Sequence, residues 1–513
     1  MWIADSHRSR EIDRLARETY GMTTAVLMER AGLAVFEALG QLAPERGKVT
    51  VLCGKGHNGG DGFVLARLAS QHQYHVECLV TSSESDLVDA CRQQMVQART
   101  QGVEPIFCDD PKWSEKLDNL RHRDVIVDAM LGTGIQDALQ GHVLAAVQKA
   151  GMSGVPVLAV DQPTGIHTDT GEELGDSIYA TRTVTFGLPK PCLFQGTGLE
   201  HAGDWTVADI GLPKDLLRTP TGARLLDAQW VVDRLPERVK TSHKGSNGHV
   251  LVVAGSTGMR GAAVLAVEAA YRAGAGMVTV ASVPDVCDTV SRRVPEALLM
   301  PLAEIDGAVS PGAAEVVLAA SARFDAALFG PGLTHGAAAT DFLAKVWPRW
   351  EKPSCLDADA LNAVALGLPL PPVDCALTPH PGEIGRLLQW PVQVVQSDRF
   401  HAVRSAVRQT GKTVLLKGPY SIVGAPDEPL NVNPTGNPGM ATAGMGDVLG
   451  GVVATLCAQD LTPYEAASCA MFWHGMSGDT CAQAVGAIGF LARDVADQLP
   501  QTRAKLVASC CED

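Results

Sequence analysis

Short apolar runs alternate with helical patterns along the first two hundred residues of the chain. Each run is rich in β-branched residues and is apolar at consecutive positions, which is typical of strands covered on both faces. Their alternation with helices indicates a parallel sheet built from β-α-β units. The pattern predicts strands at Val49–Cys53, Val76–Val80, Asp124–Asp128, Pro156–Val160 and Arg182–Phe186. We therefore expect an α/β fold here, a doubly wound, Rossmann-like three-layer sandwich.

A second series of strands and helices follows in the remainder of the chain. It predicts strands at His249–Ala254, Met277–Ala281, Phe324–Phe329 and Thr413–Lys417, with an alanine-rich helix at Ala262–Ala273. Between about residues 211 and 244 several prolines interrupt the pattern, and no clean strand is predicted. With 513 residues the chain exceeds the size of one hydrophobic core. We expect two α/β domains, residues 1–222 and 223–513.

Composition narrows the class of protein. The chain is 46% hydrophobic and 19% charged, as expected of a soluble enzyme, and its net charge of −15 argues against a nucleic-acid or anionic-membrane partner. Its 13 cysteines are scattered and form no Cys-x-x-Cys pair, which favours reduced thiols in the cytoplasm. The start of the chain lacks a secretory apolar core, and the apolar stretch 448–458 is too short to cross a bilayer. We expect a homo-oligomer acting on small molecules.

The first glycine-rich run, Cys53–Gly62, follows a predicted strand and leads into a helix predicted from Phe63. Free N–H groups and the positive end of a helix favour a bound anion at such a turn. Asn58 and Asp61 add side-chain oxygens. The alternative is a tight strand–helix turn in which Asp61 caps the helix.

Two further strand ends belong to the same edge of the predicted sheet. Asp128 precedes a Gly-Thr-Gly turn, and Asp161 precedes Pro163-Thr-Gly165. Because the carboxyl ends of parallel strands meet at one edge, we expect these turns to converge. Asn58, Asp128 and Thr164 could then supply oxygens to a monovalent or hard cation. Taken singly, each aspartate is more often a helix cap than a ligand.

These motifs, with Val127–Gly134 and Phe186–Pro191, resemble the N-terminal epimerase domain of bacterial NAD(P)H-hydrate repair enzymes. The resemblance implies K⁺ held by Asn58, Asp128 and Thr164. It also implies contacts to the hydrated dinucleotide from His57, Asn58, Gly59, Gly60, Asp61, Gly132, Thr133, Gly134, Ile135, Gln136, Asp137, Ala138 and Asp161.

The chain departs from the pattern of that family at four positions. His57, Gln136, Gln162 and Thr164 stand where the family more often has Asn, Arg, Ile and Ser. Thr164 keeps the hydroxyl, whereas Gln136 lacks the charge that an arginine offers to phosphate. Epimerisation at the hydrated ring carbon needs proton transfer, and Asp161 with Lys190 form the candidate pair. Lys190 could instead be a lysine on a surface loop.

The second glycine-rich run, Gly436–Asp447, precedes an apolar helix. It places Asp447 in the first helical turn, where free amides form an anion hole that could stabilise a transferring phosphoryl group. The alternative is that Asp447 is a plain cap. Lys417–Ser421, Thr378–Glu383 and Gly330–Gly332 each follow a strand and are expected at one sheet edge.

Together with Asp357–Asn362 and Thr378–Glu383, this run resembles the ribokinase-like superfamily, and within it ADP-dependent NAD(P)H-hydrate dehydratases. The resemblance implies a C-terminal ribokinase-like domain, with ADP as co-substrate and Mg²⁺ accompanying the nucleotide. It implies substrate contacts at Ala262, Gly332, His380 and Asp447, and nucleotide contacts at Lys417, Gly418, Pro419, Tyr420, Ser421 and Gly446. Pro419 and Tyr420 are larger than the residues usual at their positions.

The two resemblances predict a bifunctional repair enzyme. Its first domain would interconvert the R and S hydrates of NADH or NADPH, and its second would dehydrate the S hydrate with ADP. As a mechanism we hypothesise that Asp447 deprotonates the ring hydroxyl while a phosphoryl group is transferred to it, after which phosphate leaves. The alternative is a ribokinase-like kinase for a vitamin alcohol, with an N-terminal module that binds without catalysis.

Overall fold

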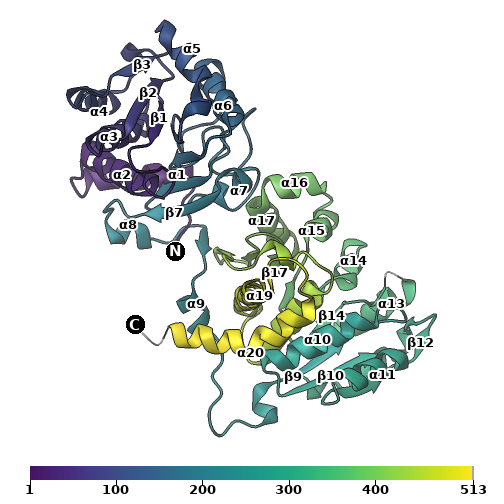
Figure 1. The fold of residues 1–513 in the computed structure, drawn as a ribbon. Coiled ribbons are helices and arrows are strands. Elements are labelled where there is room, and N and C mark those ends of the chain that lie inside the picture. The colour runs from purple at the N-terminus through teal and green to yellow at the C-terminus, as the bar shows by residue number, and fades with distance from the viewer. Residues whose placement is uncertain (335, 511–513) are drawn as a thin grey trace. The chain divides into compact units, whose positions relative to one another are not determined.

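Two units make up the chain in the computed structural model, Met1–Ala223 and Arg224–Asp513 (Figure 1). The structure describes residues 1–334 and 336–510. Both units are built from parallel sheets flanked by helices, as the sequence predicts. Each unit has a cavity of its own at a sheet edge.

The first unit, all of whose residues are described, contains a parallel sheet of seven strands in the order β3-β2-β1-β4-β5-β6-β7. That order is Rossmann-like, with the crossover between β1 and β4. The five predicted strands appear within about two residues of their expected ends. The strands are β1 (Lys48–Cys53), β2 (His75–Val80), β3 (Pro105–Phe107), β4 (Val125–Ala129), β5 (Val157–Val160), β6 (Arg182–Phe186) and β7 (Asp204–Ala208).

Helices cover both faces of this sheet and complete three layers. The helices are α1 (Ser6–Glu18), α2 (Thr24–Leu39), α3 (His57–Gln71), α4 (Asp89–Thr100), α5 (Pro111–Asp118), α6 (Gly141–Ser153), α7 (Gly198–His201) and α8 (Lys214–Arg218). Helices α2, α3 and α4 pack on one face, where Val35, Phe63 and Met95 join the core. Helices α5 and α6 pack on the other, where Trp113 and Val147 do so.

The structure corrects the predicted start of the helix that follows β1. Helix α3 begins at His57, so residues 57–62 form its first turns instead of a loop before Phe63. Asp61 therefore lies within the helix and does not cap it. The run is helical because its glycines remove side chains that would clash: a Cβ on Gly59 would lie 1.9 Å from the carbonyl oxygen of Gly54.

Among the described residues, the second unit contains a sheet in the order β11-β10-β9-β14-β15-β16-β17-β18-β19-β8. The strands from β11 to β17 are parallel, and β18 and β19 are antiparallel additions. The strands of this unit are β8 (Ala223–Leu225), β9 (His249–Val253), β10 (Met277–Ser282), β11 (Leu298–Pro301), β12 (Glu304–Ile305), β13 (Ala308–Val309), β14 (Ala326–Phe329), β15 (Ser354–Leu356), β16 (Cys375–Leu377), β17 (Thr413–Leu416), β18 (Ile422–Gly424) and β19 (Leu430–Val432).

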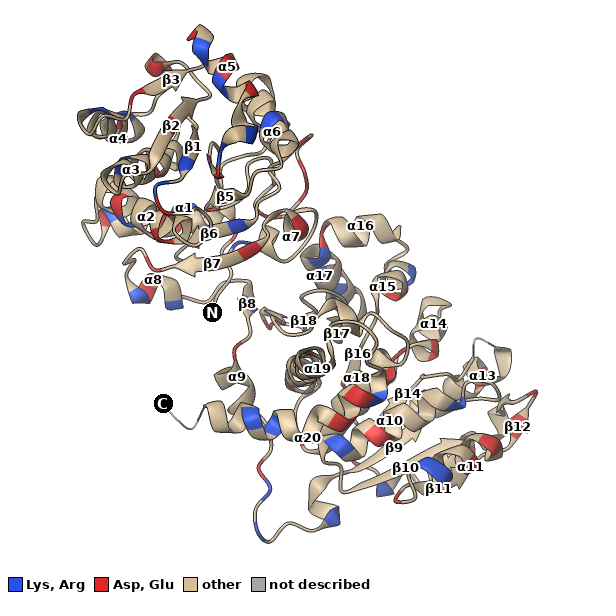
Figure 2. Ribbon diagram, viewed as in Figure 1, with Lys and Arg blue, Asp and Glu red and all other residues tan. Residues whose placement is uncertain are grey.

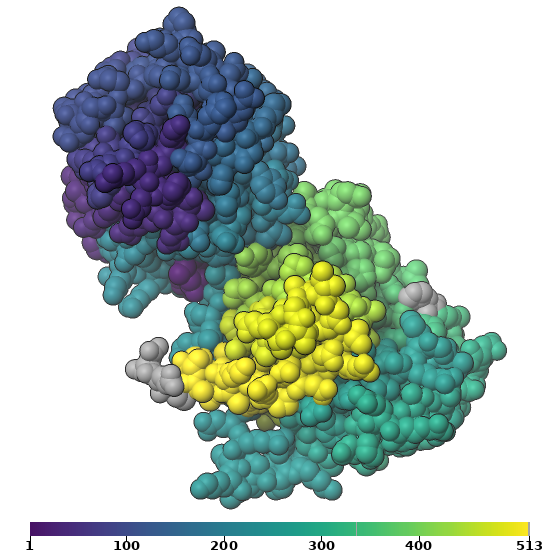
Figure 3. Space-filling view, in the orientation of Figure 1, coloured from purple at the N-terminus to yellow at the C-terminus, as the bar shows by residue number. Residues whose placement is uncertain are grey.

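The helices of the second unit include an apolar pair, α10 and α18, that pack on each other over the central strands. Helix α20 lies at the surface of the unit (yellow in Figure 3). The helices are α9 (Ala228–Val232), α10 (Arg260–Ala273), α11 (Pro284–Arg293), α12 (Ala314–Ala319), α13 (Ala337–Val346), α14 (Asp359–Ala365), α15 (Pro381–Leu388), α16 (Val392–Ser397), α17 (Arg399–Thr410), α18 (Met445–Ala458), α19 (Pro463–Val485) and α20 (Ala492–Ser509).

A short strand corrects the expectation of no strand between residues 211 and 244. Strand β8 forms the edge of the second sheet beside β19, and the Leu226 amide donates to the Val432 carbonyl at 2.9 Å. With only three residues it carries too little pattern to be recognised from sequence.

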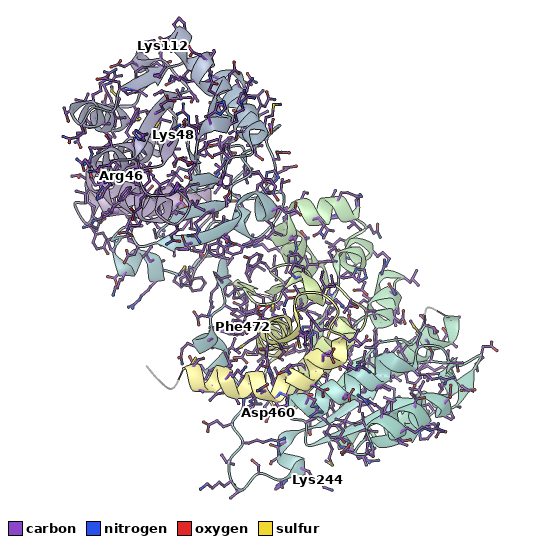
Figure 4. The ribbon with its side chains drawn as sticks, in the orientation of Figure 1. Arg46, Lys48, Lys112, Lys244, Asp460 and Phe472 are labelled. Atoms are coloured by element: carbon purple, nitrogen blue, oxygen red, sulfur yellow. The ribbon has the colours of Figure 1, made fainter. Side chains whose placement is uncertain are left out.

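Acidic and basic residues are interspersed along the ribbon of both units (Figure 2). Figure 4 labels two polar residues that mark strand and helix ends, Lys48 at the start of β1 and Asp460 in the turn after α18. In the part of the chain that the structure describes, no helix is both long and apolar enough to span a membrane.

Candidate active sites

A cavity of 510 Å³ opens at the carboxyl edge of the first sheet. Its wall combines the start of α3, the loop after β4, the end of β5 and residues from α1 and α2. The convergence expected from the strand ends is therefore present. The predicted site residues that line the cavity are His57, Asn58, Asp61, Gly132, Thr133, Gly134, Ile135, Asp161 and Lys190.

Five other residues predicted to contact substrate lie outside this wall. Gly59 and Gly60 are buried in α3, and a Cβ on Gly60 would lie 2.8 Å from the Sδ atom of Met28. Gln136, Asp137 and Ala138 are exposed in the loop between β4 and α6. Gln136 contacts His167 there, with 3.4 Å between Oε1 and Nε2.

Asp161 and Lys190 form a buried ion pair in this cavity. The Lys190 ammonium also donates to Thr185 Oγ1 at 2.8 Å and to the Phe186 carbonyl at 3.1 Å. Lys190 is only 3% exposed, so the alternative of a surface lysine is wrong. Asp161 has a φ of 68°, a left-handed conformation that costs about 1–3 kcal/mol and is concentrated at functional sites. The structure thus holds a carboxylate and an ammonium in one fixed arrangement.

Asp128 and Thr164 lie deeper in the protein than the Asp161–Lys190 pair, beneath the same turns. The Thr164 hydroxyl donates to Asp128 Oδ1 at 2.7 Å, and its amide donates to Oδ2 at 2.8 Å. Burial raises the pKa of Asp128 to about 6, although the hydrogen bonds from Thr164 oppose that rise. Asn58 is also buried, and its Nδ2 atom has no hydrogen-bond partner among the described residues. The Asp128 carboxylate and the Thr164 hydroxyl are therefore in contact in a desolvated place, and Asn58 lies beside Gly132 in the loop after β4.

The second unit has a cavity of 590 Å³ beside the turn after β17. Its wall includes all six residues predicted to contact a nucleotide: Lys417, Gly418, Pro419, Tyr420, Ser421 and Gly446. Tyr420 has a φ of 46°, so this turn holds a strained backbone where a ligand would enter. The volume is typical of a site for a small cofactor.

Lys417 lines this cavity and also contacts acidic side chains. Its ammonium lies 2.7 Å from Asp357 Oδ1 and 3.8 Å from Glu383 Oε2. Burial alone would lower the pKa of Lys417, but its interactions with Asp357 and Glu383 outweigh that effect and raise it. Lys417 is therefore a fixed positive charge at the mouth of the turn.

Asp447 lies in the first turn of α18, as predicted. The helix begins after Gly444, whose φ is 90°, and its first amides lack intrahelical acceptors. Gly446 lies close to Lys417, because a Cβ there would be 3.2 Å from Lys417 Nζ. Burial, and then the negative charge of Asp357, raises the pKa of Asp447 to about 7. A carboxyl group that titrates near neutrality is suited to proton transfer.

The remaining predicted residues are His380 and Gly332, which follow β16 and β14, and Ala262, which lies in the first turn of α10. His380 caps α15, and its Nδ1 atom accepts from the Gly382 amide at 2.9 Å. Desolvation lowers its pKa, so the ring is neutral at neutral pH. Gly332 and Ala262 lie together, since a Cβ on Gly332 would be 3.1 Å from that of Ala262.

Three further residues that support this site are not predicted from the sequence. Arg399, only 3% exposed, donates to the Pro419 carbonyl and, at 3.4 Å, to that of Lys417. Asp479 anchors the second glycine-rich run by accepting from the Gly436 amide at 2.9 Å. His474 lines the cavity, and burial lowers its pKa to about 4. All three lie on helices without a recognisable motif, so only the tertiary fold reveals them.

Comparison with known proteins agrees with both halves of this description. A family model described as NAD(P)H-hydrate dehydratase matches residues 250–501, and one described as YjeF-related protein N-terminus matches residues 24–192. The chain is 38% identical over 511 residues to a bifunctional NAD(P)H-hydrate repair enzyme Nnr from Moorella thermoacetica, with 98% of this chain and 96% of that protein covered. It is 35% identical to the protein of the same name from Escherichia coli, with 96% of this chain and 92% of that protein covered.

The solved structures agree on the fold of the second unit. A ribokinase-like superfamily protein from Enterococcus faecalis shares 26% identity and a TM-score of 0.50, covering 56% of this chain and 97% of its own. Fold and sites thus define a ribokinase-like domain joined to a Rossmann-like domain. The chain belongs to the bifunctional NAD(P)H-hydrate repair enzymes. It carries an epimerase and a dehydratase, which supports the bifunctional repair enzyme over the vitamin-alcohol kinase considered above.

Proposed function

We propose that the first cavity binds the hydrated dinucleotide for epimerisation, and that Asp447 is the base of an ADP-dependent dehydration of the S hydrate. The observation that carries this assignment is the position of Asp447, in a glycine-rich helix start beside Lys417 and next to a nucleotide-sized cavity. The predicted substrate contacts His57 to Asp61, Gly132 to Ala138, Ala262, Gly332 and His380 belong to the same proposal.

Dehydration in this scheme proceeds through a phosphate ester. As Asp447 takes the proton of the ring hydroxyl, that oxygen attacks the terminal phosphorus of ADP, and AMP leaves with the bridging oxygen. The C6–O bond then breaks with phosphate as the leaving group, assisted by the lone pair of the ring nitrogen. Loss of a proton from C5 restores the dihydronicotinamide. The sum is hydrate plus ADP giving NAD(P)H, AMP and phosphate.

Lys417 and the free amides of α18 would stabilise the charge that builds up on the transferring group. The turn Lys417 to Ser421, together with Gly446, would hold the phosphates of the nucleotide, because their backbone lies against the cavity. Arg399 supports that turn by donating hydrogen bonds to the carbonyl oxygens of Pro419 and Lys417. Neutral His380 would contact the hydrated ring as a hydrogen-bonding group.

Mg²⁺ would enter bound to the nucleotide, since it prefers phosphate oxygens and water. Asp357 fits such an ion, because its charge contributes to the raised pKa of Asp447, and a cation beside Asp357 would relieve that repulsion. When bound, the ion would neutralise phosphate charge during the transfer.

K⁺ in the first unit would be held by Asn58, Asp128 and Thr164. The donor set fits, because Asp128 and Thr164 are buried oxygens in contact, and burial holds the pKa of Asp128 near 6 in the absence of a compensating charge. When bound, K⁺ would supply a positive charge that keeps Asp128 ionised.

The state of the cysteines supports a proposal for the cellular compartment of the enzyme. Every cysteine that the structure describes is a free thiol. Free thiols are the rule in a reducing compartment, so we propose that the enzyme works in the cytoplasm on small-molecule substrates.

Nucleotide dependence tests this function. Purified protein is incubated with mixed R and S hydrates of NADPH and with ADP, ATP or neither, while dihydronicotinamide absorbance is followed. We expect recovery only with nucleotide, in a fast phase for the S hydrate and a slow phase limited by epimerisation of the R hydrate. Recovery without nucleotide, or accumulation of a stable phosphate ester, would contradict the proposal.

The pH dependence of dehydration follows from Asp447. The base must be ionised, and its pKa is raised to about 7. The rate of dehydration of pure S hydrate should therefore increase about tenfold between about pH 6 and about pH 8, and it should be constant at higher pH. A flat profile over that range, measured as kcat/KM for the hydrate, would argue against Asp447 as the base.

A further inference from the structure

One face of helix α1 contributes charged side chains to the epimerase cavity. Arg10, Asp13 and Arg17 lie at positions i, i+3 and i+7, so they share a face, and all three line the cavity. Helix α1 is held in place, because its Ile12 and Ala16 are buried in a core cluster with residues of α2 and α8. The helix is therefore a fixed part of the wall, although it lies outside the sheet and its motifs.

Asp13 is the acid on this face. Within the described residues no hydrogen bond or ion pair engages its carboxyl group, which is exposed toward the cavity. The charged or titratable groups that face it are Asp161, Asp61, Lys190, Arg17 and His57. Burial, and then the negative charge of Asp161, raises its pKa above the ordinary value, against the opposing effect of Lys190. An unpaired carboxyl thus stands in the same cavity as the Asp161–Lys190 pair.

We propose that Asp13 is a catalytic residue of the epimerase, which exchanges a proton with the hydrated ring from the side of α1 while Asp161 acts from the sheet edge. The inference rests on the proposed function of this cavity, because it assigns a second proton-transfer group to the same reaction. Asp161, ion-paired with Lys190, is the base, and Asp13 is the acid when it carries a proton.

The chemistry of the hydrate requires two such groups. Hydration of the dihydronicotinamide ring places a hydroxyl on C6, which is bonded to N1, and this makes the centre a hemiaminal. Asp161 takes the hydroxyl proton, the C6 carbonyl forms, and the C6–N1 bond breaks with its electron pair going to N1. Asp13 gives its proton to N1. Rotation about C5–C6 and closure on the other face of the aldehyde return both protons and give the other epimer, with no co-reactant.

Asp61 is a less suitable acid, although it lines the same cavity. It is fully surrounded within α3, and burial followed by the charge of Asp161 raises its pKa well above the ordinary value. The residue is only 8% exposed, so it meets a bound ring less freely than Asp13 does. Asp13, on the rim formed by α1, is less desolvated and is balanced by Arg17 and Lys190.

The test uses the full chain and the two-phase recovery of NADPH from mixed hydrates with ADP. Asp13→Asn should reduce the slow phase by about 10²-fold or to the uncatalysed rate. The fast phase should be unchanged, and it reports that the protein is folded. Glu18→Gln is the matched control, because Glu18 is an exposed acid of the same helix that pairs with Arg14, and it should leave both phases unchanged.

Asp13→Glu distinguishes an acid from a merely structural group. This variant should recover a measurable part of the slow phase, and its rate should fall with rising pH around a midpoint different from that of the native enzyme. A slow phase within about twofold of the native rate in Asp13→Asn, together with its loss in Asp161→Asn, would overturn the role of Asp13 alone. Native rates in both variants would overturn the assignment of the cavity as well.

Discussion

Replacing Asp447 by Asn is expected to reduce dehydration by about 10²–10⁴-fold, the usual contribution of a positioned base. The amide keeps the size of the side chain but cannot accept the hydroxyl proton. It also removes one of the negative charges that repel each other near Lys417, so nucleotide should bind at least as well. The measurement is single-turnover recovery of NADPH from the S hydrate with saturating ADP.

Asp460→Asn is the matched control for that experiment. Asp460 follows the other end of the same helix, is exposed, and has a φ of 68°, which asparagine adopts readily. It should dehydrate at the native rate. Turnover of Asp447→Asn within about threefold of the native enzyme would show that another group removes the proton.

Replacing Asp161 by Asn is expected to abolish catalysed epimerisation and to lower stability. The change leaves the Lys190 ammonium buried without its carboxylate, and loss of one partner of a buried ion pair costs about 3–5 kcal/mol in free energy of unfolding. Chemical denaturation and the rate of R–S interconversion, followed without nucleotide, measure the two effects.

The double variant Asp161→Asn/Lys190→Met separates stability from catalysis. Without the buried ammonium, the double variant should regain much of the lost stability but no epimerase activity. Lys112→Met, an exposed lysine on α5, should change neither quantity. Epimerase activity in the double variant would mean that the ion pair serves only the fold.

Much of the fold could be predicted from the sequence, because strands covered on both faces produce unbroken apolar runs such as Val125 to Val127. These apolar runs do not indicate the residue at which the following helix begins. The start of α3 at His57 depends on the packing of glycines against β1 and α2, a contact between distant segments. Strand β8 was missed because three residues do not establish a period.

The candidate sites likewise contain some residues that sequence motifs predict and others that only the packing of helices brings to the site. Motifs at strand ends predict Asp161, Lys190 and Lys417, since parallel topology brings such ends to one edge, and the glycine-rich helix start predicts Asp447. Asp13 and Arg399 reach the sites from helices whose sequence gives no sign of it. Their contributions depend on how those helices pack, which apolar periodicity predicts only in part.

The most direct test of the central claim is the recovery of NADPH from an equal mixture of R and S hydrates with ADP, compared among the native enzyme, Asp161→Asn and Asp447→Asn. The account predicts two phases for the native enzyme, loss of the slow phase alone in Asp161→Asn, and loss of both phases in Asp447→Asn. Loss of the slow phase alone in Asp447→Asn, or two native phases in either variant, would contradict it.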